Sequence, residues 1–128
     1  DLDGAFWRPS ADAKLRQGVH ASATGVYLDG LVEAFELARS CGDDARSQRY
    51  AQSIVRGVEH LQTLQYNQNS TKTYLPEVAQ HIQGGLRTTP WNGWLRVDNE
   101  AHAILALVKI ARLRGQIEES IKNGKPSP

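Results

Sequence analysis

Two stretches of the sequence are apolar around most of a helical circumference, and this feature constrains the fold more than any other. Between His20 and Ser40, and again between Asp98 and Arg114, apolar residues occupy most sides of a helix and are not confined to one stripe. Such helices are stable in water when neighbouring elements enclose them. Segment 44–66 is amphipathic instead, with a single apolar stripe. The pattern predicts an all-α fold with helices near 20–41, 44–66 and 98–114.

One amphipathic helix is too little to cover two helices of this kind. If one face of such a helix, on the order of 400 Å² of apolar surface, stays in contact with water, about 10 kcal/mol of hydrophobic free energy is lost. This is comparable with the free energy of unfolding of a whole domain. We therefore expect that the chain does not act as an isolated monomer. The expected partner is either the rest of a longer polypeptide or a second copy in a homo-oligomer.

The length of 128 residues is that of one domain, which we place over residues 1–128. The chain begins at Asp1 and contains no methionine, so we expect a fragment of a larger protein or a processed product. After Gly115 the sequence becomes polar, and residues 116–128 are predicted to form a frayed tail.

Charge and motif content exclude several classes of function. The 15 basic and 14 acidic residues are interspersed, so the sequence has no electrostatic footprint for nucleic acid or for an anionic membrane surface. The longest apolar stretch, 101–110, is too short to span a bilayer. The single Cys41 and the scattered histidines lack the spacing of a metal site, and no nucleotide-binding or serine hydrolase motif occurs. We predict no metal and no cofactor.

Segment 67–96 has no helical period and is long for a connection in a compact domain, which indicates structure or function of its own. Within it, Pro90-Trp91-Asn92-Gly93 lies between two short alternating runs, and Asn-Gly tolerates positive φ. The pattern predicts a short β-hairpin near 85–97, immediately before the third helix.

Three motifs carry a resemblance to a known superfamily: Gly4-Ala5-Phe6, Gly84-Gly85-Leu86 and the run from Arg96 to Ala103. In each half of the chain a Gly and aromatic segment precedes an apolar helix, and this order resembles the α/α toroids. Among these, the motifs resemble the six-hairpin proteins that act on glycans, such as glycosidases, sugar epimerases and polysaccharide lyases. The resemblance implies helical hairpins of an incomplete toroid, of which this chain holds about one and a half.

The resemblance also implies a carbohydrate site at the loops that end the buried helices. There an indole can stack on a sugar ring, an arginine can bind hydroxyl or carboxylate groups, and a carboxylate or imidazole can transfer protons. The candidate catalytic residues are Asp98, Glu100 and His102. The candidate substrate-binding residues are Trp7, Arg87, Trp91, Trp94 and Arg96.

Each candidate also has a purely structural interpretation. Asp98 stands where a helix N-cap belongs, and His102 can be a hydrogen-bonded core residue. The tryptophans can cover the hairpin, and Arg96 can face solvent or support the cap. An acidic stripe on the first helix, formed by Asp29, Glu33 and Glu36, can be a solvated face or can supply an acid and base pair to a cavity.

Two functions therefore remain open from the sequence. The first is a portion of a glycan-acting toroid that binds or processes carbohydrate through its loop rim. The second is a non-enzymatic helical module that packs its apolar helices on a partner or on a second copy. The residues alone leave open whether the chain is an enzyme.

Overall fold

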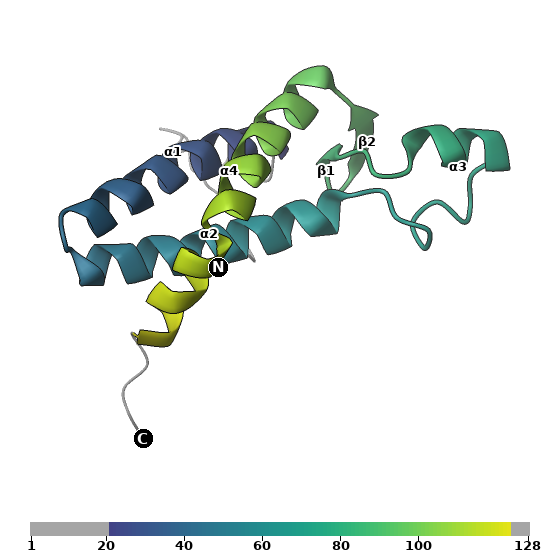
Figure 1. The fold of residues 1–128 in the computed structure, drawn as a ribbon. Coiled ribbons are helices and arrows are strands. Elements are labelled where there is room, and N and C mark those ends of the chain that lie inside the picture. Colours follow the sequence, from purple (N-terminus) through teal and green to yellow (C-terminus); the bar gives the residue numbers. More distant parts are fainter. Residues whose placement is uncertain (1–20, 124–128) are drawn as a thin grey trace, which may run out of the picture.

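The computed structural model describes residues 21–123, which form four helices and a two-stranded antiparallel sheet. In chain order these are α1 (Ala21–Ser40), α2 (Asp44–Leu64), α3 (Pro76–Ile82), β1 (Arg87–Thr89), β2 (Asn92–Leu95) and α4 (Val97–Asn123). Helices α1 and α2 form a hairpin, and α4 crosses over and packs against both of them (Figure 1). The sheet and α3 extend from one end of this three-helix unit. The all-α prediction with one short β-hairpin is confirmed.

The turn between α1 and α2 follows local backbone chemistry. Gly42 adopts φ of 68°, in the left-handed region that glycine enters without steric cost. The Asp43 backbone N–H donates to the Ala38 carbonyl at 2.9 Å, and the Asp43 side chain accepts the Arg46 N–H at 2.9 Å. A glycine therefore ends the first helix and an aspartate caps the second.

The core lies where the three long helices meet. Its fully buried large side chains include Leu28, Val32 and Phe35 of α1 with Ile54, Leu61 and Leu64 of α2, and α4 adds Ala103 and Ala106. The helices approach closely at Gly25, where an added Cβ would lie 2.8 Å from the Ala103 backbone nitrogen. Small residues therefore set the crossing of α1 and α4.

Helix α4 differs from the prediction in both length and burial. It continues through Gly115 to Asn123, so the expectation of a frayed tail is wrong for residues 116–123, while 124–128 lie outside the described residues. Ile117 and Ser120 are buried, and Arg39 donates to Ser120 Oγ at 3.0 Å. These contacts offset the cost of about 1 kcal/mol for a glycine inside a helix. Within residues 21–123, α4 is covered on one side, not all round.

The segment before α4 contains the predicted hairpin and one element that the sequence analysis missed. Strands β1 and β2 pair Arg87 with Leu95 and Thr89 with Asn92, inside the expected range 85–97. The missed element is α3, which begins at Pro76 and carries Glu77 in its first turn. Proline and an acidic residue at the start of a helix are favourable, and this was its available signal. No helix among the described residues is long and apolar enough to cross a membrane.

Candidate functional site

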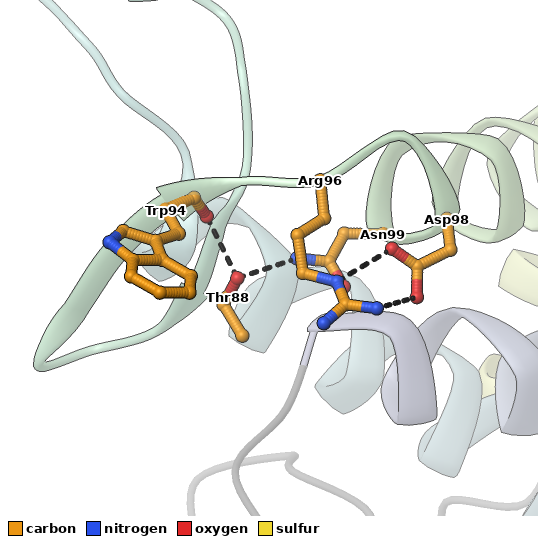
Figure 2. Close-up of polar contacts among 5 residues, drawn as sticks. All are labelled: Thr88, Trp94, Arg96, Asp98 and Asn99. Atoms are coloured by element: carbon orange, nitrogen blue, oxygen red, sulfur yellow. Dashed lines mark hydrogen bonds and ion pairs between the residues drawn. The ribbon is translucent and has the colours of Figure 1, made fainter.

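The candidate residues of the described part of the chain lie where the β-hairpin meets the first turns of α4, a region that we call the junction (Figure 2). It comprises residues 86–102. Strand β1 carries Arg87, strand β2 carries Trp94, and α4 carries Asp98, Glu100 and His102. The fold brings these residues into one region, and Arg87 and Glu100 also have contacts within the chain that the sequence did not indicate.

Arg87 closes the end of α2. Its Nη2 donates to the Thr63 carbonyl at 2.7 Å and its Nε donates to the Leu64 carbonyl at 3.3 Å. The guanidinium also lies over the Tyr66 ring, 5.5 Å from the centroid. The last carbonyls of a helix lack internal partners and form its negative end, so a cation is favourable there. Arg87 therefore has a structural role at the end of α2, and its role as a substrate ligand stays a prediction.

Glu100 holds the strand segment against the helix. Its Oε1 accepts the backbone N–H of Leu86 at 2.6 Å, and Leu86 itself is buried. The same oxygen would lie 3.3 Å from a Cβ placed on Gly85, so the glycine leaves room for the carboxylate. A carboxylate committed to a backbone donor in this way is poorly suited to act as a general acid or base.

Asp98 is not the N-cap of α4. The helix begins at Val97, and the carbonyl of Arg96 accepts the Glu100 N–H, so Asp98 lies inside the first turn. Its carboxylate instead pairs with Arg96 through two contacts of 2.9 and 3.1 Å. Hydrogen bonding from the Arg96 guanidinium lowers the pKa of the Asp98 carboxyl below its ordinary value. Because both side chains are about half exposed, the pair contributes little to stability.

The ion pair can be tested by titration. We expect carboxyl chemical shifts from NMR to give Asp98 a pKa below its ordinary value, and Arg96→Gln to raise it toward that value. Any stability that the pair adds is complete above the ordinary pKa and is lost as the pH falls through the lowered one. Arg114→Gln, which removes a different ion pair of α4, is the control and should leave the Asp98 pKa unchanged. An unshifted Asp98 in the wild type would contradict the pairing.

His102 and the tryptophans are exposed. His102 follows Asp98 by one helical turn, but its side chain faces solvent and the structure gives no hydrogen bond between the two, so the core interpretation is wrong. Trp91 is 78% exposed and Trp94 is 73% exposed, so neither indole packs into the hairpin as the structural alternative expected. Trp7 lies outside the described residues.

A buried network of hydrogen bonds at the junction was not predicted from the sequence. The Asn99 side-chain amide donates to Thr88 Oγ1 at 3.0 Å, and Thr88 Oγ1 donates to the Trp94 carbonyl at 2.8 Å (Figure 2). Asn99 is fully buried, and its Oδ1 has no hydrogen-bond partner among the described residues. These hydrogen bonds connect both strands to α4. No local pattern in the sequence marks this network, because its members belong to three different elements.

The acidic stripe of α1 serves as an anchor for α4. Lys109 lies 2.8 Å from Asp29 Oδ1 and also pairs with Glu33, while Glu36 is exposed. Hydrogen bonds to Asp29 and then Glu33 raise the pKa of Lys109, which keeps it charged at neutral pH. The stripe therefore does not present an acid and base pair to a cavity. No group of three potential metal ligands is found among residues 21–123.

Two surface hollows of the described chain lie away from the candidate catalytic residues. One, of about 470 Å³, is lined by Tyr66 and by side-chain amides of the segment after α2. The other, of about 230 Å³, lies between Arg39, Asp44 and the end of α4. Asp98, Glu100 and His102 line neither of them.

Comparison of the chain with protein-family models, with curated proteins and with solved structures gives no match.

Proposed function

We propose that this chain is a helical interaction module that acts by packing the outer face of α4 against another apolar helix. This outer face is formed by Val97, Ala101, Ile104, Leu105, Val108, Ala111 and Gly115. Its large side chains are 86%, 56%, 57% and 45% exposed at positions 97, 104, 105 and 108. The observation that carries the proposal is this row of exposed aliphatic side chains on one helix face.

The opposite face of α4 is already in use. Ala103 and Ala106 pack against α1 and α2, and Lys109 binds the acidic residues of α1. The outer face therefore faces away from the core of its own chain. Burying a Val, Leu or Ile side chain fully contributes about 1.5–3 kcal/mol, so covering several of them supplies enough free energy for binding. Contiguous apolar patches of this kind commonly mark interaction sites.

Interaction is favoured over catalysis by what the junction residues do. Arg87 caps α2, Glu100 accepts a backbone N–H, and Asp98 is held by Arg96. Only His102 among the catalytic candidates lacks a described partner, and one imidazole on an open surface has no positioned second group for acid and base chemistry.

The proposal predicts where a dye for exposed apolar surface binds. At dilute protein concentration we expect the fluorescence of 8-anilinonaphthalene-1-sulfonate to rise with the wild-type chain. Leu105→Glu should reduce the rise severalfold, because it places a charge in the outer face of α4. Leu37→Glu, an exposed position on α1, is the matched control and should leave the fluorescence nearly unchanged. Dye binding that is absent, or that Leu105→Glu does not reduce, would contradict the proposal.

Carbohydrate binding at the hairpin is a second candidate, and the exposure of Trp91 and Trp94 favours it. An exposed indole offers a flat apolar face that suits the faces of sugar rings. In this proposal the chain is part of a glycan-acting α/α toroid, and its hairpin supplies a section of the loop rim. The candidate is independent of the α4 face, because different side chains carry it.

A tryptophan fluorescence titration tests the second candidate. We expect cellohexaose, xylohexaose or oligogalacturonate to shift the emission of the wild-type chain and of Trp7→Phe, which removes the tryptophan outside the hairpin. The shift should be lost in Trp91→Ala and in Trp94→Ala. A wild-type emission that none of these sugars changes counts against carbohydrate binding by the hairpin.

A further inference from the structure

The outer face of α4 contains a coiled-coil repeat. Its central residues recur at alternating spacings of four and three: Val97, Ala101, Ile104, Val108, Ala111 and Gly115. All six are exposed, and a Cβ added at Gly115 would meet no atom within 4 Å. Apolar residues at this spacing form the seam through which two helices interlock side chains along their length. The seam therefore fits a long apolar helix, and not a flat surface or a short loop.

One flank of the seam has opposite charges at its two ends. Asp98, Leu105 and Arg112 follow one another at intervals of seven residues, so they form one row beside the seam. Asp98 is held at the surface by Arg96, and Arg112 is exposed and has no ion-pair partner among residues 21–123. The row thus runs from an acidic end through a leucine to a basic end.

We propose that the occupant of this face is α4 of a second copy, packed antiparallel about a two-fold axis that passes between Ile104 and Val108. This inference rests on the proposed function and names the partner. In this arrangement Ile104 faces Val108 of the second copy, Ala101 faces Ala111, and Val97 faces Gly115. Each large side chain is opposite a smaller one or one of similar size, so the seam is complementary to itself, as a two-fold interface requires.

Charge selects the antiparallel orientation. Two antiparallel helices place Asp98 of each copy beside Arg112 of the other, and the two copies of Leu105 meet at the axis. A parallel pair would place the two flank rows on opposite sides of the seam, so Asp98 of one copy would lie far from Arg112 of the other and this attraction would be absent. The side chains of the seam and the flank provide about 400 Å² per copy, or about 800 Å² in total, which is below the ~1,000 Å² expected of a stable interface, so we expect a weak, reversible dimer with a dissociation constant in the micromolar range or above.

Charge reversal tests both the partner and its orientation. We expect sedimentation equilibrium to show a reversible dimer, and Asp98→Arg or Arg112→Asp alone to raise its dissociation constant at least about tenfold at low salt. The double variant Asp98→Arg/Arg112→Asp should restore dimerisation to within about twofold, and a mixture of the two single variants should form a heterodimer. Arg56→Asp, an exposed reversal on α2, is the control and should have no effect.

The possible results separate this inference from the proposed function. A dimer that is insensitive to Asp98→Arg, as expected of a parallel pair in which Asp98 and Arg112 of different copies lie apart, overturns the inference. A monomer at every concentration that still binds the apolar dye at α4 also overturns it, while leaving the proposed function in place. A monomer that binds no dye contradicts both. Melting temperatures of the variants in dilute solution will show whether each one is folded.

Discussion

Gly25→Ala is expected to destabilise the protein by about 2–3 kcal/mol, although alanine favours helices more than glycine does. The added Cβ would lie 2.8 Å from the Ala103 nitrogen and 2.9 Å from the His102 carbonyl carbon. Both are backbone atoms of α4, so no side-chain rotation relieves the clash and the two helices must move apart. Urea unfolding followed by circular dichroism measures the change.

Gly30→Ala is the matched control for this prediction. Gly30 lies in the same helix, and a Cβ added there would meet no atom within 4 Å. We expect this substitution to stabilise the protein by about 0.5–1 kcal/mol, because it lowers the conformational entropy of the unfolded chain and improves helix propensity. Equal effects of the two substitutions would show that the close crossing of α1 and α4 is not a feature of the protein in solution.

Glu100→Ala is expected to cost about 2 kcal/mol, because it leaves the Leu86 N–H without an acceptor in a buried position. Glu100→Gln retains an oxygen that can accept this hydrogen bond, and we expect it to cost less than about 1 kcal/mol. The measurement is again chemical unfolding. Glu36→Ala, an exposed carboxylate on α1, serves as the control and should change stability by less than about 0.5 kcal/mol.

The comparison of alanine with glutamine separates the two roles considered for Glu100. A structural acceptor predicts a large loss for alanine and a small one for glutamine. If the Glu100→Ala protein is as stable as the wild type, the hydrogen bond between Glu100 and the Leu86 N–H does not stabilise the fold. Glu100 would then again be a candidate for acid and base chemistry.

The elements that could be predicted from the sequence are those set by interactions within a few residues. The periodicity of α1 and α2, the glycine in the turn between them and the Asp43 cap all act over one or two helical turns. The hairpin follows in the same way from the turn residues around Asn92 and Gly93. Local backbone sterics and local hydrogen bonds decide these features, and both can be recognised in a short window of sequence.

The roles of the junction side chains depended on contacts between distant segments. From the sequence, Arg87 could bind a sugar or the end of a helix. In the structure it binds the end of α2, because the fold places the carbonyls of Thr63 and Leu64 beside it. Glu100 similarly found the N–H of Leu86, 14 residues away. A charged side chain has the same chemistry in every sequence context, so its role depends on which donor or acceptor the tertiary structure places within reach.

A helical period can be counted along the chain, so the sequence alone predicts that α4 is a helix with apolar residues on most of its sides. The end of this helix and the side of it that is covered depend on contacts with distant segments. Its last turns are held by Arg39, which lies 81 residues before its hydrogen-bond partner Ser120. Its inner face is the one that can approach α1 closely at Gly25. The hydrophobic effect favours burial of any apolar face but is not directional. Packing geometry therefore determines which face of α4 is buried by α1 and α2, and the outer face of α4 stays exposed.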